Sequence, residues 1–460
     1  MSQLLISFIC LFFSTLVQAQ TIQDQSLLSD SFSNVMITLN PSVRPIIQQI
    51  GQQEFESNQA KRFALVENMR AWTQAVQGPL LFLLQDLKVA NMTIKSFWIT
   101  NGIIVRNLPL PLLELVLLLS VPFNIASIER VQEFPVLPTF DSGPVLTAAP
   151  QVAPAMPWGI KDVNAPQVWD QGIRGQGCTV GIIDTGVRET HEAIAGRVLL
   201  DQCLDPMTGL SSVPDLNGHG THVTGTICGG MGIGVAPEAE VVMCKGCGTS
   251  FCTQDSLLTC GEHMICPTSD CEDGPDIVSN SWGGGSNSDS YDDMLFSWEI
   301  VGMLPVFAIG NSGPACSTAN TPGDRPIAFG VGAVMINKNL TSFSSKGPTN
   351  AGNIKPEISA PGANVLSADF KTNDGYQSLS GTSMACPHVA GVAALLISAF
   401  PGITTDNLRN VLVQSTNKSV VTSGFGCGGK VNSNFPNNYY GHGFVDALKA
   451  LNLASQLLTK

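Results

Sequence analysis

A serine at the start of a small-residue helix is the first candidate for chemistry in this sequence. Ser383 lies in the segment Ser-Gly-Thr-Ser-Met-Ala-Cys-Pro-His, and the apolar stretch that follows predicts a buried helix. Pro387 suits the first turn of that helix, where a missing N–H costs little. Free backbone N–H groups and the helix dipole favour negative charge at such a position. The segment therefore offers half of an acyl-transfer site, although Thr382 or Ser383 could equally act as a helix cap.

Three further residues have the chemistry that a serine nucleophile needs, namely a base, a carboxylate and an amide donor. Asp184 ends an apolar run, His219 stands in the glycine-rich segment Asn-Gly-His-Gly-Thr-His, and Asn311 follows a second apolar run. Each has an ordinary alternative. Asp184 could cap a turn, His219 could bond to the backbone, and Asn311 could hold a left-handed turn. His222, three residues further on, competes with His219 for the role of base.

The elements that must position these residues follow from the alternation of apolar runs with helical segments. A run that is apolar on both faces suits a strand inside a parallel sheet. The alternation therefore predicts an α/β fold in which a parallel sheet has helices on both faces. The predicted strands are residues 180–183, 241–244, 277–280, 304–309 and 327–331.

The order of Asp184, His219 and Ser383, with their flanking residues, resembles the subtilisin-like serine proteases, the subtilase family. The resemblance implies that Ser383 is the nucleophile, that His219 is the general base, and that Asp184 orients the imidazole. It implies that Asn311 donates a hydrogen bond to the oxyanion, beside the backbone N–H of Ser383. It also implies protein or peptide substrates and an acyl-enzyme intermediate. The middle of the chain is similar to the bacillopeptidase-F-like branch at residues 245–247, 276–284, 310–314 and 341–348.

The same resemblance assigns two segments to substrate binding. The main chain of one would pair with an extended peptide as an added strand, and the other would form the opposite wall of the primary pocket. Neither has an acidic residue to demand a basic substrate side chain, so we expect a roomy pocket with an apolar or broad preference. The floor of the pocket falls somewhere in residues 316–324, and His222 and His388 are expected to be structural. The two walls are Ser281, Trp282, Gly283 and Gly284, and Ala308, Ile309 and Gly310.

The composition is typical of a large, well-buried and turn-rich enzyme. In 460 residues, 44% are hydrophobic, 13% are charged and 45 are glycine. The formal net charge of −13 argues against nucleic acid as a partner. The acidic residues match no recognisable ligand loop, so we expect no metal and no other cofactor, although structural calcium is common in the family.

The cysteines predict disulfides if the chain enters an oxidising compartment. Of 13 cysteines, only Cys10 falls in the N-terminal leader. Four of the others leave a zinc site open as an alternative, because Cys-x-x-Cys is a common ligand pair. Cys386, one turn beyond Ser383, is expected to be buried. The four possible zinc ligands are Cys244, Cys247, Cys266 and Cys271.

The N-terminus predicts export. Residues 1–19 end in Val-Gln-Ala after a short apolar run, which is typical of a signal peptide, although no positive charge lies near Met1. We therefore expect a secreted protein, with a lysosomal or vacuolar lumen as the alternative. Prolines interrupt the apolar run at 108–123, so we expect a buried helix there and no transmembrane segment. Glycosylation sequons begin at Asn91, Asn339 and Asn417.

Residues 20–150 are predicted to form a separate small α+β domain followed by a linker. Residues 134–157 are rich in proline and small residues, which is typical of a cleavable linker. The resemblance implies that 20–150 is an inhibitory propeptide and that 151–460 is the catalytic domain. The pattern of the domain is strand, helix, strand, helix and strand, with strands predicted at 34–39 and 97–105 and helices near 56–77 and 112–119.

The favoured interpretation is a serine endopeptidase made as a self-inhibited precursor, and two rivals stay open. A catalytically silent relative could act as a binding protein, although all four catalytic roles are filled. A processing protease of narrow specificity is the second rival. An aspartic protease would need two Asp-Thr-Gly motifs facing each other, and this chain has one.

Overall fold

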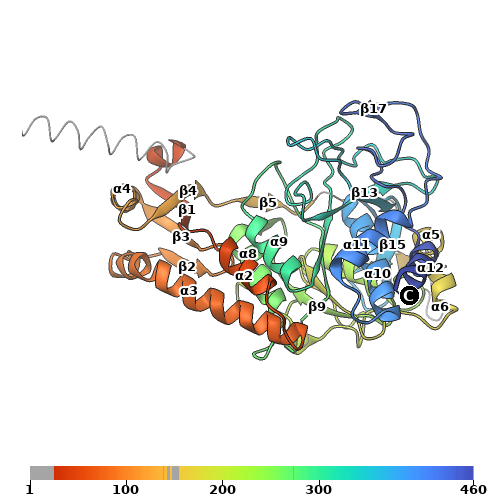
Figure 1. Cartoon of the computed structure of the whole chain (residues 1–460), viewed down its shortest axis with the longest axis horizontal. Helices are drawn as coiled ribbons and strands as arrows, with labels where there is room; N and C mark the ends of the chain where they lie inside the picture. Colours follow the sequence, from red (N-terminus) through yellow and green to blue (C-terminus); the bar gives the residue numbers. More distant parts are fainter. Residues whose placement is uncertain (1–24, 138, 142–145, 148–154, 273, 459–460) are drawn as a thin grey trace, which may run out of the picture.

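A computed structural model describes residues 25–137, 139–141, 146–147, 155–272 and 274–458. The signal peptide predicted at 1–19 lies outside the described residues. Figure 1 shows a smaller N-terminal unit beside a larger unit that contains the rest of the chain.

Six parallel strands form the centre of the larger unit: the five that the sequence predicts and β14, which it did not. Their order across the sheet is β14-β13-β12-β11-β8-β9, and every neighbouring pair is parallel. The strands are almost wholly buried because helices cover both faces of the sheet. Their bounds are β8 (Thr179–Ile183), β9 (Glu240–Cys244), β11 (Ile277–Asn280), β12 (Leu304–Ala308), β13 (Phe329–Val334) and β14 (Ile358–Pro361).

Two pairs of helices cover the sheet. Helices α7 (His219–Cys228) and α10 (Thr382–Ala399) pack on one face, and α8 (Gln254–Ile265) and α9 (Asp292–Ile300) pack on the other. Among the described residues, α10 alone is long and apolar enough to cross a membrane, yet 83% of it is buried inside the protein. It is therefore the core helix predicted after Ser383. The remaining helices of this unit are α5 (Trp158–Asp162), α6 (Ala165–Trp169), α11 (Thr405–Gln414), α12 (Ala447–Leu458) and the 3₁₀ helix η2 (Leu200–Gln202).

The N-terminal unit is a four-stranded antiparallel sheet with its own hydrophobic core. The strand order is β2-β3-β1-β4, so the first and last strands of the unit lie side by side. Its elements are η1 (Gln25–Ser29), β1 (Phe32–Leu39), α2 (Arg44–Gly51), α3 (Asn58–Asp86), β2 (Thr93–Phe97), β3 (Gly102–Pro109), α4 (Leu110–Leu118) and β4 (Ile125–Arg130).

The single strand predicted at 97–105 is wrong. The structure has a hairpin there, since β2 ends at Phe97 and β3 begins at Gly102. Asn101 has a positive φ of 49°, which an asparagine before a glycine tolerates in a tight turn. The unit therefore has four strands where the sequence pattern predicted three.

A second hydrophobic core joins the two units. Trp98 and Ile99, in the hairpin turn, pack in the same cluster as Leu258 of α8 and Trp298 of α9. The N-terminal unit thus lies on the face of the sheet that α8 and α9 cover (Figure 1).

The segment that follows the N-terminal unit continues across the larger unit as three short strands. Strand β5 (Glu133–Pro135) pairs antiparallel with β10 (Phe251–Thr253). Strands β6 (Phe140–Asp141) and β7 (Leu146–Thr147) pair antiparallel with β16 (Gly375–Ser380), whose other neighbour is β15 (Val365–Ala368). A small hairpin, β17 (Gly426–Cys427) and β18 (Lys430–Val431), lies near the C-terminus.

In the part of the chain that the structure describes, the cysteines form four disulfides, so the alternative of a zinc site is wrong. All four possible ligands are used, and the described residues contain no group of three or more His, Cys, Asp or Glu side chains that could hold a metal ion. Cys386 is buried and free, as are three other cysteines in the described part of the chain, Cys178, Cys203 and Cys228. The disulfides are Cys244–Cys260, Cys247–Cys252, Cys266–Cys271 and Cys316–Cys427.

The longest disulfide loop should contribute most to stability. The Cys316–Cys427 disulfide closes a loop of 111 residues, and Cys266–Cys271 closes one of 5. Constraint of the unfolded chain predicts a loss of up to about 5 kcal/mol of unfolding free energy for the double serine variant of the first pair. The same change at the second pair should cost about 2 kcal/mol. Equal losses in urea unfolding would contradict this ranking.

Candidate active site

The four predicted catalytic residues lie at one edge of the parallel sheet. Asp184 directly follows β8, and Asn311 lies three residues after β12. His219 and Ser383 stand at the first turns of α7 and α10, which pack against each other. Because the carboxyl ends of parallel strands meet at one edge, residues far apart in the sequence come together there.

His219 and Asp184 form a buried pair. The Nδ1 atom of His219 lies 2.8 Å from Oδ1 and 3.0 Å from Oδ2 of Asp184. Only 3% of the His219 side chain and 2% of the Asp184 side chain are exposed. Burial lowers the pKa of His219, but the adjacent Asp184 carboxylate raises it, and the net shift is upward from the ordinary 6.5. The carboxylate therefore fixes the ring and favours its protonated form.

Ser383 is fully buried at the start of α10, and its hydroxyl donates to the backbone oxygen of Ser281 at 3.3 Å. The Nε2 atom of His219 is buried and has no hydrogen-bond partner within the described ranges. The hydrogen bond expected between Ser383 and His219 is therefore not made in this conformation. Such bonds are often long without a substrate and shorten when one binds.

Asn311 is oriented by the residue before Ser383. Its Oδ1 atom accepts hydrogen bonds from the backbone N–H and the hydroxyl of Thr382, both at 2.9 Å. Its Nδ2 atom lies 3.4 Å from the position that a Cβ atom would take on Gly381. The donor end of the amide thus lies at the first turn of α10, where the backbone of Ser383 also begins the helix.

The first wall segment, Ser281 to Gly284, is hydrogen-bonded to Ser383 at its first residue. The hydroxyl of Ser281 donates to the backbone oxygen of Ser383 at 3.0 Å. Trp282 points into the core, where its ring packs 5.4 Å from that of Phe307, so only its main chain can face a substrate. Gly284 donates its N–H to the oxygen of Thr321 at 2.9 Å.

The second wall segment is tied to the first by Asn320, which the sequence did not single out within 316–324. The backbone N–H of Asn320 donates to the oxygen of Ile309 at 2.9 Å, and its side chain donates to the oxygen of Gly285 at 3.0 Å. Asn320 Oδ1 would lie 1.9 Å from a Cβ atom on Gly310, so only glycine fits there. Ala308 and Ile309 are buried.

The chain between the two units passes close to this site. Phe134 of β5 would lie 2.7 Å from a Cβ atom on Gly284, and its ring is 6.3 Å from that of Trp282. Further on, the backbone of Phe140 pairs with Ser380, three residues before Ser383. The segment therefore pairs first with β10 and then with β16, the strand that leads into Ser383.

The two other predicted histidines have structural positions. The Nε2 atom of His222 lies 3.0 Å from the oxygen of Val365, and burial lowers its pKa to about 3. The Nδ1 atom of His388 lies 2.8 Å from the oxygen of Met384, and burial lowers its pKa to about 4. Both rings are buried, and neither contacts Asp184 or Ser383 through a hydrogen bond that the described residues show.

Asp215, a buried carboxylate four residues before His219, was not predicted from the sequence. It accepts hydrogen bonds at the first turn of α7 and from Thr185. Its only signal in the sequence is its position just before the glycine-rich motif.

Comparisons with known proteins agree with this geometry. The model of the subtilase family matches residues 175–443. Bacillopeptidase F of Bacillus subtilis is 33% identical over 87% of this chain, but the match spans only 29% of that protein's own length. Subtilisin DY of Bacillus licheniformis is 36% identical over 56% of this chain and 91% of its own. Subtilisin Savinase of Lederbergia lenta is 36% identical over 60% of this chain and 97% of its own.

The buried His388 should make the fold sensitive to acid. Its pKa is about 4 in the folded chain and close to 6.5 when unfolded, so the unfolded chain binds more protons between these values. The stability it contributes is complete above pH 6.5 and is lost as the pH falls through about 4. His388→Gln should therefore lose about 3 kcal/mol less unfolding free energy than the wild type between pH 7 and pH 4.

Urea unfolding at a series of pH values checks this expectation. His442→Gln is the control, because His442 is only partly buried. Parallel pH profiles for the wild type and His388→Gln would contradict the assignment.

Proposed function

The chain belongs to the subtilase family of serine proteases, and on that premise we propose that it hydrolyses peptide bonds through Ser383, His219 and Asp184. The observation that supports this most strongly is the buried His219–Asp184 pair at the start of α7, a helix that packs against α10, where Ser383 lies in the first turn. Protein or peptide substrates fit the family.

The proposed reaction proceeds in two halves. His219 Nε2 takes the proton of Ser383 as its Oγ attacks the carbonyl carbon of the peptide bond. Asn311 Nδ2 and the backbone N–H of Ser383 donate to the resulting oxyanion. His219 then gives the proton to the departing amine, which leaves an acyl-enzyme. Water, deprotonated by the same imidazole, attacks the ester and releases Ser383.

We assign the two wall segments to substrate binding. The main chain from Ser281 to Gly284 would pair with an extended peptide as an added strand. The side chain of Asn320 lies against Gly285 and Gly310, so it would add a polar, uncharged amide to the roomy pocket of apolar or broad preference that the sequence predicts.

We propose that residues 20–150 are an inhibitory propeptide and that 151–460 is the catalytic domain. The pairing of β5 with β10 and of β6 with β16 supports this, because segments in these places would exclude a substrate from Ser383. Residues 1–19 would be the signal peptide of a secreted or luminal precursor, with glycans on Asn91, Asn339 and Asn417.

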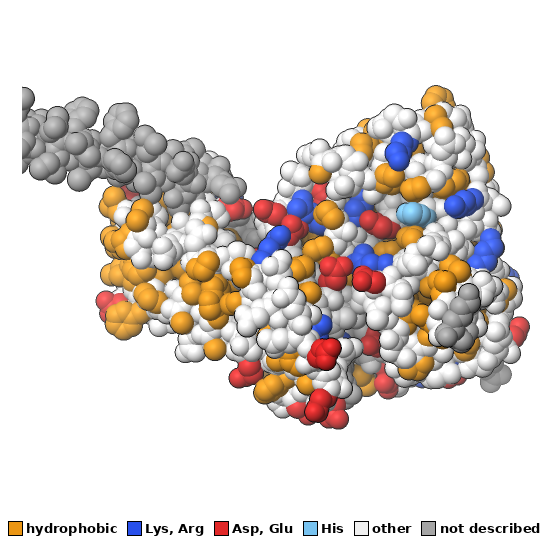
Figure 2. All heavy atoms as spheres, viewed as in Figure 1, with side chains coloured by type: hydrophobic (Ala, Val, Ile, Leu, Met, Phe, Trp, Pro, Cys, Tyr) orange, Lys and Arg blue, Asp and Glu red, His pale blue; other side chains and the backbone are white. Residues whose placement is uncertain are grey.

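Polar contacts supplement the apolar core that holds the N-terminal unit against α8 and α9. Arg106 lies 2.6 Å from Asp255, at the first turn of α8. Glu262 accepts hydrogen bonds from the backbone N–H groups of Trp98 and Ile99. Acidic and basic side chains gather along the junction of the two units (Figure 2).

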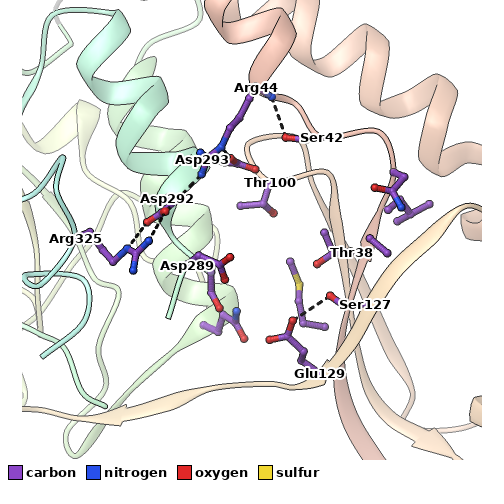
Figure 3. Close-up of a pocket in the computed structure, with 16 residues that line it drawn as sticks. Thr38, Ser42, Arg44, Thr100, Ser127, Glu129, Asp289, Asp292, Asp293 and Arg325 are labelled. Atoms are coloured by element: carbon purple, nitrogen blue, oxygen red, sulfur yellow. Dashed lines mark hydrogen bonds and ion pairs between the residues drawn. The ribbon is translucent and has the colours of Figure 1, made fainter. Parts of the chain in front are cut away.

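A further ion pair between the units, Arg44 with Asp293, borders a cavity of about 520 Å³. Figure 3 shows Arg44 of the N-terminal unit reaching towards α9. Its Nε lies 2.7 Å from Asp293, while Arg325 makes two bonds of 2.7 Å to Asp292. The N-terminal unit thus meets acidic residues at the first turns of both helices that it covers.

Removal of the oxyanion donor should slow the reaction without weakening substrate binding. Asn311→Ala should lower kcat about 10²–10³-fold, the loss found when the corresponding donor is removed from a subtilisin, with KM nearly unchanged. Peptide hydrolysis by the purified enzyme measures both constants.

Ser383→Ala is the reference for these measurements and should show no hydrolysis and no labelling by a serine-directed phosphonate. A loss confined to KM in Asn311→Ala would make Asn311 a pocket residue. Labelling that does not depend on Ser383 would favour the catalytically silent rival.

The precursor should cut itself. We expect the first cut between Asp141 and Pro157, so Ser383→Ala should accumulate as the uncut chain. Purified wild-type enzyme added to that chain should restore the cut, which shows that the bond is accessible. If Ser383→Ala, expressed alone and free of other proteases, were cut like the wild type, self-maturation would be wrong.

A further inference from the structure

Asp215 accepts more hydrogen bonds at the start of α7 than a helix-capping side chain needs. Its Oδ1 accepts from the backbone N–H groups of Asn217 at 3.0 Å and Gly218 at 2.8 Å. Its Oδ2 accepts from the backbone N–H of Thr221 at 2.9 Å and from the hydroxyl of the same residue at 2.6 Å. These donors lie on both sides of His219, so one carboxylate holds the backbone before and after the proposed base.

A fifth hydrogen bond connects the Asp215 carboxylate to Thr185, the residue that follows Asp184. The hydroxyl of Thr185 donates to Asp215 Oδ1 at 2.9 Å and accepts the backbone N–H of Gly220 at 2.9 Å. Thr185 directly follows Asp184, and its N–H donates to Asp184 Oδ1 at 2.7 Å. The end of β8 and the start of α7 are therefore joined twice, once through His219 and once through Thr185 and Asp215.

We propose that Asp215 is a positioning residue for proteolysis, which rests on the function proposed above. It holds α7 against Asp184 and Thr185 so that His219 keeps Nδ1 on Asp184 and Nε2 towards Ser383. Its negative charge also stabilises the imidazolium that forms when Ser383 attacks.

The other charged or titratable groups around His219 do not duplicate this role. Asp184 bonds the ring directly, and His222, one turn along α7, is buried with a lowered pKa. Lys245 donates to the oxygen of Pro214, and the guanidinium of Arg188 donates to the oxygen of Phe370. Burial lowers the pKa of His219, Asp184 raises it, and Asp215 adds to that rise.

Asp215→Asn tests the charge. It should lower kcat and shift the acid limb of kcat/KM to lower pH, because His219 loses a nearby negative charge while the side chain keeps its shape. Asp205→Asn is the matched control, since Asp205 is also buried and accepts a backbone N–H, from Met207 at 2.9 Å. The control should leave the acid limb in place. An acid limb unchanged in Asp215→Asn would overturn the electrostatic part of the proposal.

The Thr185 hydroxyl tests the positioning, even if Asp215→Asn does not fold. Thr185→Val should lower kcat about tenfold or more with little change in KM, because a small displacement of the base is costly. Thr185→Ser keeps the hydroxyl and should restore most of the rate. Valine and serine variants both equal to the wild type would overturn the positioning role.

Titration of the His219 imidazole by NMR in the uncut Ser383→Ala chain separates this proposal from the function on which it rests. The pKa of His219 should be lower with Asp215→Asn than without it, and unchanged with Asp205→Asn. A shifted pKa together with a wild-type enzyme that cuts no peptide would refute the proposed function alone. An unshifted pKa in a chain that does cut peptides would refute the role of Asp215 alone.

Discussion

The contact between Asp184 and His219 is the constraint on which the rest of the structure depends. Taking a carboxylate and an imidazole out of water is costly unless hydrogen bonds replace those of the solvent. Here the replacement comes from a strand end and a helix start that are 35 residues apart. The parallel sheet supplies the strand end, and α7, which packs closely on the helix that carries Ser383, supplies the helix start. A large, rigid α/β core is therefore the support that a few polar atoms at its edge require.

Local patterns were enough to predict five of the six parallel strands and the core helix, and the resemblance to the subtilases singled out the four residues that lie at the edge of the sheet. Asp184, His219 and Ser383 each stand where an apolar run meets glycine, so their positions can be read from neighbouring residues. Asp215 could not be found in this way, because its partner Thr185 lies 30 residues earlier and meets it only after folding. Asn320 was missed for the same reason. The hairpin turn at Asn101 was missed although Asn-Gly is a known turn signal, because the apolar residues on both sides of it were interpreted as one strand.

The pairing of the cysteines also lay beyond the sequence, since spacing alone permits many connectivities. The structure leaves four cysteines free among the described residues, all within the larger unit that carries the disulfides.

The burial of these four free cysteines has a consequence for disulfide exchange. A thiol attacks a disulfide only as the thiolate, and only where the sulfur can be reached. Burial raises the pKa of all four thiols: that of Cys203 to about 11, those of Cys228 and Cys386 to about 12, and that of Cys178 well above its ordinary value. In the folded state these thiols are protonated and inaccessible, so the native pairing does not scramble. Once the chain unfolds, the same four thiols are exposed and can attack the disulfides as thiolates. The native pairs are then exchanged for others before the chain can refold.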